Sequence, residues 1–276
     1  MKLSSIHIYP IKSCQGITVT EAEVALKGLK NDRCLMVVDS NGKFITQRQL
    51  PSLATIITSL DHDSLTLKVA NNTLSPITFT PEYQTGNLIP VEIWGQETMA
   101  VEQEKAVSEW LRRALDIDEQ IFLVAQTPDC RLTIDPKYSL RRRAPVTFSD
   151  GYPLLLTNTA SLKLLNEKIR DTYKSSENQV TMDRFRPNLV IENDQPFAED
   201  NWREITIGAV TFDLVKPCKR CIVTTTNQNT GQRNSLQEPL KTLATFRNFP
   251  TQGILFGVNI IPRNQGLISV QSTINL

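Results

Sequence analysis

Residues 34–47 read CLMVVDSNGKFITQ, and this stretch decides the fold class. Cys34 to Asp39 forms a short apolar run, which is typical of a buried strand. Asn41-Gly42 follows, and this dipeptide is the strongest short-range signal for a tight hairpin turn. A return strand is expected over Phe44 to Gln47. The stretch therefore predicts antiparallel β-structure.

The flanking sequence continues this pattern on both sides. Short β-rich segments recur at the spacing of an antiparallel barrel or sandwich, at residues 18–24, 53–60, 64–69 and 91–94. Apolar residues at helical spacing predict a helix over Glu104 to Leu115, and further helices are expected over Thr159 to Arg170 and Leu240 to Phe246. Regular βαβ alternation is missing, so the prediction is an α+β fold, mainly antiparallel β.

Composition excludes several classes of protein. The chain has 276 residues, which fits one large or two ordinary domains, and 30 Lys and Arg against 29 Asp and Glu give a net charge of +1. A charge so close to zero argues against a general nucleic-acid or acidic-membrane binder. Neither a signal peptide nor a run of apolar residues long enough to span a membrane is visible. We therefore expect a cytoplasmic protein without membrane or nucleic-acid partners, whose five cysteines are not paired in disulfides.

The most specific chemical feature is the Cys-x-x-Cys motif in Lys216-Pro217-Cys218-Lys219-Arg220-Cys221. Neighbouring cations favour the thiolate, which attacks electrophiles and binds soft metals. A zinc site would need a second ligand pair, and none has matching spacing. A thioredoxin-like pair would open a helix, whereas Ile222 to Thr226 is predicted to be a strand. Two unremarkable loop cysteines remain the third interpretation.

Short basic clusters lie where predicted strands meet loops. Lys12-Ser13, Arg33 and Arg186 each stand beside a β-rich segment. Arginine recognises phosphate through two parallel hydrogen bonds, so a shared anionic ligand is one hypothesis. Each cluster taken alone is more often a solvated face or a turn, and only the repeated placement at strand ends favours the shared ligand.

A third cluster, Ser149-Asp150-Gly151, leads into the apolar run that ends at Leu156. Asp-Gly is ordinary turn chemistry, although Asp150 could also hold the edge of a heterocycle or relay a proton. No glycine-rich phosphate loop is present, and with only His7 and His62 a Ser-His-Asp triad is improbable.

Taken together, these segments resemble the MOSC proteins that carry an N-terminal β-barrel domain, and especially the branch of the mitochondrial amidoxime-reducing component and its bacterial relatives. The resemblance runs nearly from end to end. It implies an N-terminal β-barrel domain over residues 1–122 and a MOSC β-barrel domain with a few helices over residues 123–276. The motifs that carry it are YPIKSCQG (residues 9–16), NDRCLMVV (31–38), SDGYPLLL (149–156), RFRPNLVI (184–191), PFAEDNW (196–202) and CKRCIVTTTNQNTG (218–231).

This resemblance implies a molybdenum cofactor, Mo-molybdopterin, with Cys221 as the protein ligand of the metal. Soft thiolate ligation agrees with a cysteine among cations. Cys221 and Asp150 are the predicted catalytic residues, Asp150 as a proton donor. The predicted cofactor-binding residues are Lys12, Ser13, Arg33, Ser149, Asp150, Gly151, Arg186, Asn188, Lys219 and Cys221.

The implied reaction is the two-electron reduction of small N-hydroxylated compounds, from N–OH to N–H. Some relatives have a fused iron–sulfur domain, whereas the last cysteine here is Cys221, so either a separate ferredoxin- or flavin-type electron donor is expected or the sequence is a shortened form of a longer protein. Arg141 to Arg143 are a candidate docking patch for an acidic redox partner, or merely a solvated face. The alternative function is a non-enzymatic carrier of sulfur or of the cofactor that uses Cys221.

Overall fold

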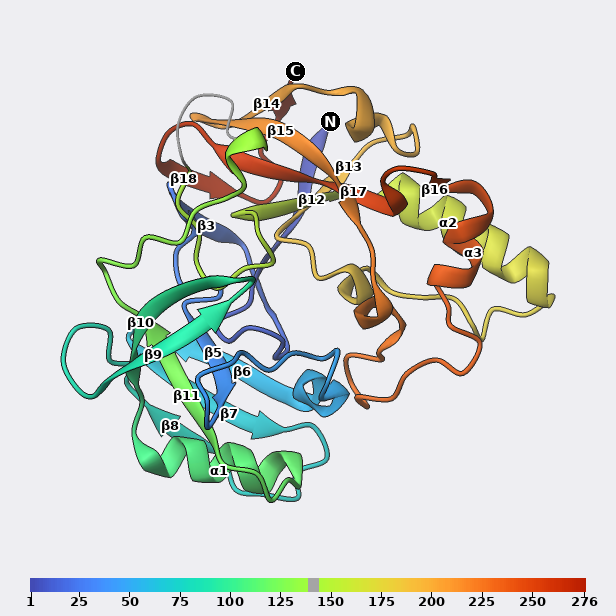
Figure 1. The fold of residues 1–276 in the computed structure, drawn as a ribbon. Coiled ribbons are helices and arrows are strands. Elements are labelled where there is room, and N and C mark those ends of the chain that lie inside the picture. The colour runs from blue at the N-terminus through green and yellow to red at the C-terminus, as the bar shows by residue number, and fades with distance from the viewer. Residues whose placement is uncertain (139–143) are drawn as a thin grey trace.

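The computed structural model describes residues 1–138 and 144–276. Over these residues the chain forms four sheets and only three α-helices, and all strand pairs but one are antiparallel (Figure 1). The predicted α+β class, mainly antiparallel, is confirmed. None of the described helices is both long and apolar enough to cross a membrane.

The largest sheet dominates the upper part of Figure 1. Its strands follow the order β19-β14-β15-β17-β12-β13-β1-β2, with β16 paired to β17, and β12 and β13 run parallel. Its strands are β1 (Lys2–Ile8), β2 (Ile17–Val19), β12 (Leu154–Asn158), β13 (Leu189–Glu192), β14 (Glu204–Ile207), β15 (Val210–Lys219), β16 (Asn248–Phe249), β17 (Gly253–Pro262) and β19 (Ile274–Asn275).

Three smaller sheets complete the fold, in the orders β5-β11-β10-β9, β6-β7-β8 and β18-β3-β4. The first two lie in the lower part of Figure 1, beside α1. Their strands are β3 (Glu21–Ala25), β4 (Gly28–Leu29), β5 (Leu35–Asp39), β6 (Ile56–Asp61), β7 (Ser64–Val69), β8 (Ile77–Phe79), β9 (Leu88–Ile93), β10 (Gln96–Glu102), β11 (Ile121–Gln126) and β18 (Gly266–Ser269).

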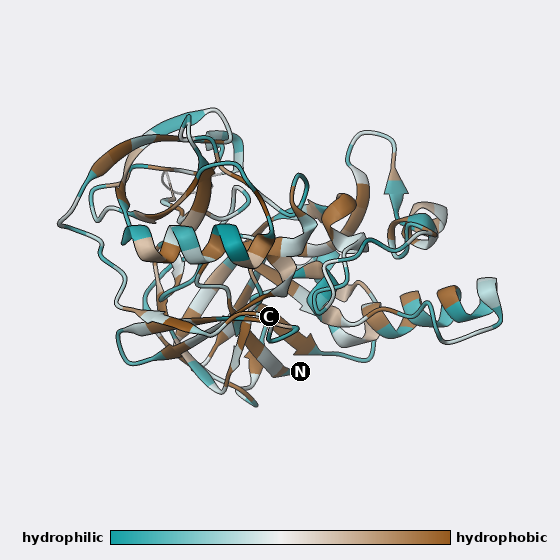
Figure 2. Cartoon of the chain, turned by 90° about the horizontal axis from the view of Figure 1, so that it is seen from below, coloured by the Kyte–Doolittle hydropathy of each residue, from teal (hydrophilic) through white to brown (hydrophobic). Residues whose placement is uncertain are grey.

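The helices form where the sequence predicts them. The α-helices are α1 (Lys105–Leu115), α2 (Thr159–Tyr173) and α3 (Leu240–Phe246), and short 3₁₀ turns are η1 (Pro51–Thr55), η2 (Pro136–Tyr138), η3 (Met182–Phe185), η4 (Ala198–Asn201) and η5 (Ile222–Thr225). In α1 the apolar face, including Trp110 and Leu111, is buried against β11. Apolar residues concentrate along the strands, while the connecting loops are mostly hydrophilic (Figure 2).

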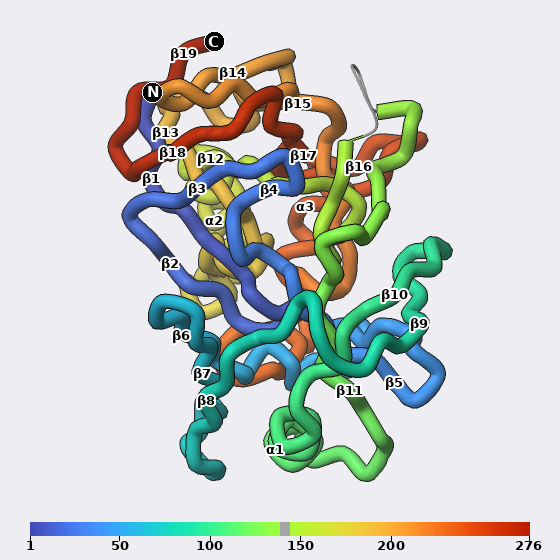
Figure 3. Tube along the Cα trace, turned by 90° about the vertical axis from the view of Figure 1, so that its left-hand side faces the viewer, coloured from blue at the N-terminus to red at the C-terminus, as the bar shows by residue number. Residues whose placement is uncertain are grey.

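The first strands belong to the sheets of the C-terminal half. β1 pairs with β13, and β3 pairs with β18. The amide of Ile274 donates to the Met1 carbonyl at 3.1 Å, and both termini lie side by side (Figure 3). The chain then leaves β1 and crosses into the lower part of the molecule, which places residues 9–16 at the junction. The predicted boundary between residues 122 and 123 stays a prediction.

Two predicted strands are wrong. Asp39 Oδ1 accepts from the amides of Asn41 and Lys43 and builds the predicted turn, but Phe44 to Gln47 forms no strand. Pairing stops after the Ile45 amide donates to the Val37 carbonyl at 2.8 Å. The ladder partner of β5 is instead β11, more than eighty residues further along the chain.

The second wrong strand is Ile222 to Thr226, which forms the 3₁₀ turn η5. The Cys221 carbonyl accepts from the amide of Thr224 at 3.1 Å and from its hydroxyl at 2.9 Å. The Thr225 hydroxyl closes the turn by donating to the Ile222 carbonyl at 2.7 Å. These threonines favour strands by their shape, but here their hydroxyls stabilise a turn.

Gly257 shows how tightly β17 and β12 approach each other. It has a φ of +75°, and a Cβ there would lie 2.6 Å from the Leu156 carbonyl oxygen. Gly95, in the turn between β9 and β10, has a φ of +74° but open space around the same position. The two glycines therefore have nearly the same φ, but only at Gly257 would an added Cβ clash with a neighbouring strand.

We expect Gly257→Ala to lower the free energy of unfolding by about 2–4 kcal/mol, because a steric clash adds to the cost of the left-handed backbone. Gly95→Ala should cost only about 1 kcal/mol. Urea denaturation of both variants measures the difference. Equal losses would show that the close contact between β12 and β17 is not tight.

Candidate functional site

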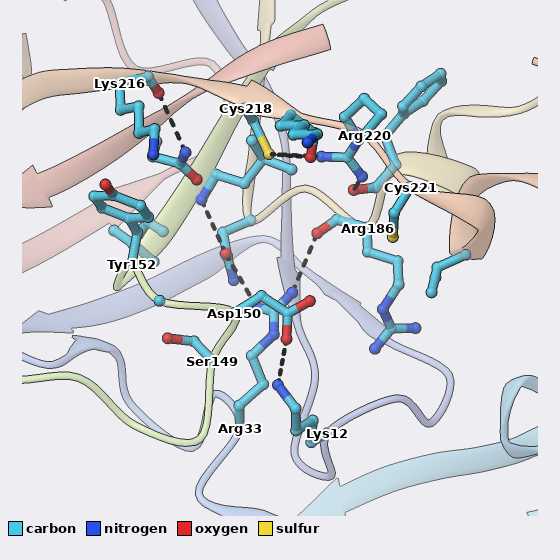
Figure 4. A pocket seen from close by; sticks show the side chains of 18 of the residues that line it. Lys12, Arg33, Ser149, Asp150, Tyr152, Arg186, Lys216, Cys218, Arg220 and Cys221 are labelled. Carbon is cyan, nitrogen blue, oxygen red and sulfur yellow. Dashed lines mark hydrogen bonds and ion pairs between the residues drawn. The ribbon is translucent and has the colours of Figure 1, made fainter. Parts of the chain in front are cut away.

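A cavity of about 320 Å³ lies at the junction of the two parts of the molecule. All ten residues that the sequence predicts to bind a cofactor line it, although they come from five separate segments of the chain (Figure 4). These residues are Lys12, Ser13, Arg33, Ser149, Asp150, Gly151, Arg186, Asn188, Lys219 and Cys221. Arg141 to Arg143, the candidate docking patch, lie outside the described residues.

Unusual backbone conformations place several of these side chains. Ser13, Arg33 and Arg186 have φ values of 70°, 51° and 54°, in the left-handed region that non-glycine residues rarely adopt. Ser13 lies in a turn, Arg33 in a bend and Arg186 directly after η3, and all three line the cavity. Such strain is typical of functional sites, because surrounding structure must maintain it.

Arg33 is held from two sides. Asp32, which is 1% exposed, accepts from Arg33 Nη1 at 2.6 Å and from the Tyr9 amide at 2.9 Å. Arg33 also donates to Asn188 Oδ1 at 3.1 Å and to the Arg186 carbonyl at 3.2 Å. Asn188 Oδ1 also accepts from the Leu155 amide at 3.2 Å, and its Nδ2 donates to the His7 carbonyl at 3.1 Å, so this side chain connects three separate segments of the chain.

Lys12 forms the second cationic centre. It is 3% exposed, and its Nζ donates to the Phe148 carbonyl at 2.8 Å and pairs with Asp150. Burial lowers the pKa of Lys12, and the Asp150 carboxylate opposes that effect. Arg48 Nη2 reaches the other Asp150 oxygen at 3.3 Å.

These cations determine the state of Asp150. Burial alone would raise the pKa of its carboxyl, but Lys12 and then Arg48 hold that pKa well below its usual range. Asp150 is therefore an ionised carboxylate near neutral pH. In that state it accepts hydrogen bonds and does not donate a proton.

Unlike Lys12, Arg33 and Arg48, Arg186 forms no salt bridge with the described residues. Its Nη1 donates to Gln228 Oε1 at 3.1 Å, while its buried Nη2 has no hydrogen-bond partner in residues 1–138 and 144–276. Burial lowers the pKa of Arg186, and both Arg33 and Arg186 lie 4.3 Å from the centre of the Tyr9 ring. The Ser149 hydroxyl is likewise buried and unpaired within the described chain. Unpaired buried donors that line a cavity indicate a polar or anionic ligand.

The cysteines fall into two groups. Burial raises the pKa of Cys14 and Cys34 to about 12, which keeps both as thiols. Cys218 and Cys221 are half-buried and line the cavity, and Arg220 Nη1 donates to Cys218 Sγ at 2.9 Å. Cys221 directly precedes η5, and its Sγ points toward the side where Arg186 lies (Figure 4).

A single sulfur cannot by itself hold a metal. No group of three or more His, Cys, Asp or Glu side chains in the described part of the chain could bind an ion. A metal at Cys221 would therefore take its remaining ligands from a cofactor. The unpaired Arg186 and Ser149 groups fit the anionic and polar atoms of such a molecule.

Sequence analysis missed several cavity residues. Burial alone would lower the pKa of Arg48, but the nearby Asp150 and, to a smaller extent, Cys221 raise it. Trp94, Tyr152, Lys216 and Arg220 also line the cavity. Lys216 and Arg220 belong to the Cys-x-x-Cys segment, whose cations the sequence already marked, and Tyr152 lies in one of the family motifs. Arg48 follows the predicted hairpin, whereas Trp94 ends a predicted strand and gave no signal.

The site thus defines a class: a protein of two β-rich parts with a cationic cavity that exposes one cysteine pair. Residues 1–118 match the MOSC N-terminal beta barrel domain, and residues 143–275 match the MOSC domain. The chain belongs to the family of MOSC proteins with an N-terminal MOSC barrel, as its sequence motifs predict.

Curated relatives agree with this assignment. The chain is 33% identical to "Mitochondrial amidoxime-reducing component 1" of Homo sapiens over 99% of this chain and 82% of that protein. Identity to the Mus musculus protein of the same name is also 33%, over 92% of this chain and 74% of that protein. "Molybdenum cofactor sulfurase" of Danio rerio is 32% identical over 89% of this chain but only 30% of its own length.

We expect Asp32→Asn to lower the free energy of unfolding by about 3–5 kcal/mol, because it leaves the buried Arg33 without its counter-charge. Glu23→Gln breaks the exposed pair with Lys30 and should cost about 1 kcal/mol or less. Chemical denaturation at pH 7 compares the two variants. Similar losses would contradict the role of Asp32 as the partner that holds Arg33.

The Asp150 pair predicts a pH dependence. A carboxyl with a lowered native pKa stabilises the fold above its unfolded pKa, near 3.8, and loses that contribution as the pH falls toward the native pKa. Asp150→Asn should therefore be less stable than the parent by a constant amount between pH 5 and 7, and the difference should shrink below about pH 4. Urea denaturation across this range tests it, with the exposed Asp61→Asn as a control. A gap that widens in acid would contradict the ion pair.

Proposed function

We propose that this protein is a molybdenum-cofactor-dependent reductase of small N-hydroxylated compounds. The observation that carries the proposal is the cavity itself. It combines a half-exposed thiol at Cys221 with buried, unpaired donor atoms of Arg186 and Ser149. The similarity to amidoxime-reducing components over nearly the whole chain supports the reaction class.

The cofactor would be held along the cavity. Cys221 Sγ would ligate the molybdenum, since soft thiolates suit such metals. Arg186 Nη2 and the Ser149 hydroxyl would bind anionic and polar atoms of the pterin part, with Ser13, Gly151 and Lys219 lining the same surface. Arg33 and Asn188 are positioning residues, because their polar groups are already paired within the protein.

When bound, the cofactor supplies the two-electron chemistry, and the protein supplies binding and electrostatics. The balanced reaction for an amidoxime is R–C(=NOH)NH2 + 2 e⁻ + 2 H⁺ → R–C(=NH)NH2 + H2O. The ionised Asp150 does not suit the predicted role of proton donor. We therefore propose that it orients Lys12 and Arg48, whose positive charges would attract the substrate oxygen and the anionic cofactor.

The electrons would come from a separate redox protein of the ferredoxin or flavin type. Such a partner is needed because the reaction consumes two electrons per turnover.

A second candidate function is a non-enzymatic carrier of sulfur or of the cofactor. It is favoured by the equal degree of identity to molybdenum cofactor sulfurases, which this chain matches over part of their length. The same Cys221 would then carry a persulfide or ligate cofactor in transit. Both functions predict cofactor binding, so only turnover separates them.

The first test measures molybdenum per protein by elemental mass spectrometry, after expression in a host that makes the cofactor. We expect near-stoichiometric metal in the parent, at least a tenfold loss in Cys221→Ala, and retention in Cys218→Ala, which removes the neighbouring thiol of the same cavity. Equal metal in the parent and in Cys221→Ala would exclude Cys221 as the essential ligand. No metal in any of them, from a host that loads a control enzyme, would contradict the cofactor.

The second test is turnover of benzamidoxime by the loaded protein with an artificial electron donor. A reductase forms benzamidine, and Cys221→Ala should be at least a hundredfold slower, since it lacks the metal ligand. Loaded protein that forms no benzamidine would support the carrier instead.

A further inference from the structure

A second cavity of about 360 Å³ opens beside the first. The two share Trp94, Ser149, Gly151, Tyr152 and Lys216 in their linings, so they are adjacent. Gly151 lines both cavities, and a Cβ there would meet nothing within 4 Å. None of the cysteines lines the second cavity, and the proposed cofactor site does not need it.

The lining of the second cavity is mainly apolar. Ile93, Leu132, Ile134 and Val146 contribute to it from the segments around β9 and from the stretch after β11. Trp94 forms the boundary with the first cavity and keeps 44% of its surface exposed. Such a lining suits a planar organic group, because aromatic and aliphatic side chains favour flat apolar ligands.

Trp94 lies between this cavity and the first one, which Cys221 lines. The Arg48 guanidinium lies 5.0 Å from the centre of the Trp94 indole. Arg48 and Cys221 both line the first cavity, so the arginine that contacts the indole borders the same space as the sulfur. A molecule lying along Trp94 can present one end to the neighbourhood of Cys221.

Two buried hydroxyl groups mark a polar edge in the second cavity. Thr147 and Ser149 are each 4% exposed, and neither hydroxyl has a hydrogen-bond partner within the described ranges. An unpaired buried hydroxyl costs free energy, so a ligand that pairs with it gains affinity. Thr147 lines only the second cavity, so its hydroxyl is not explained by the proposed cofactor site.

We propose that the second cavity is the subsite for the organic part of the substrate, a planar and mostly apolar ring system with one hydrogen-bonding edge. The ring lies against Trp94, the Thr147 hydroxyl binds its polar edge, and the N–OH group extends past Arg48 toward Cys221. This inference rests on the proposed function, since it names the class of substrate for that site. It predicts a preference for aryl and heteroaryl substrates over hydroxylamine itself.

The test compares two substrates in matched variants. Benzamidoxime carries a ring, and hydroxylamine has the same reacting bond without one. In Thr147→Val the ratio of kcat/KM for benzamidoxime to that for hydroxylamine should fall about fivefold, which is typical of one lost hydrogen bond. In Trp94→Ala the ratio should fall about tenfold or more, since an aromatic contact is lost.

Thr157→Val is the control, because the Thr157 hydroxyl is also buried and unpaired but lies on β12, outside both cavities. Its substrate ratio should match the parent. Neither Thr→Val change should reduce stability, since each replaces an unpaired hydroxyl by a methyl group. Unchanged ratios in both Thr147→Val and Trp94→Ala would overturn the subsite and leave the reductase function standing.

Binding to the cofactor-free protein gives a readout that does not depend on activity. Benzamidoxime should quench tryptophan fluorescence in the parent and in Thr157→Val, bind about fivefold more weakly to Thr147→Val, and give no quenching in Trp94→Phe. Quenching without turnover by the loaded protein would support the subsite and contradict the reductase. Quenching that persists in Trp94→Phe would overturn the subsite, as would its absence in the parent.

Discussion

The arrangement of buried positive charge at the junction is the constraint on which the rest of the structure depends. Lys12, Arg33 and Arg186 have little access to water, and burying a cation without compensation is very unfavourable. Two of them are neutralised within the protein, by Asp150 and Asp32. Arg186 forms no salt bridge with the described residues. Its guanidinium and that of Arg33 both lie 4.3 Å from the centre of the Tyr9 ring. The fold therefore keeps an excess of positive charge around the cavity, which an anionic ligand would neutralise.

The chain path explains why this charge is assembled from distant segments. β1 forms part of the large sheet with β13, and the chain then crosses directly to the lower part of the molecule. Lys12 and Ser13 lie in that crossing, and Arg33 lies in the return from β4 to β5. Asn188, just before β13, ties these segments together through Arg33 and the Leu155 amide. A change in any of these segments would displace the cations relative to Cys221.

The sequence predicted the site better than it predicted the local structure around it. Charged residues beside strand ends were visible as a pattern, and the family resemblance assigned them one ligand, which agrees with their position in one cavity. The strand predicted for Ile222 to Thr226 was wrong because threonine hydroxyls bond to nearby carbonyls, an effect that propensity does not capture. The partner of β5 was wrong because a tight turn predicts pairing with the next segment, whereas β11 supplies the longer ladder. Trp94 and Thr147 gave no signal, since an exposed tryptophan in a turn and a buried threonine gain meaning only from the cavity between them.

The two candidate functions place different demands on this architecture. A carrier of sulfur or cofactor needs Cys221 and the cationic cavity, and nothing more. A reductase of small molecules also needs space beside the reacting centre for the part of the substrate that does not react, because binding that part contributes to catalysis. The second cavity supplies such a space, and it shares Trp94 with the cavity that Arg48 and Cys221 line. Its Thr147 hydroxyl, buried and unpaired within the described residues, would offer a hydrogen bond to that part of a substrate. The second cavity, more than Cys221 itself, therefore favours an enzyme over a carrier.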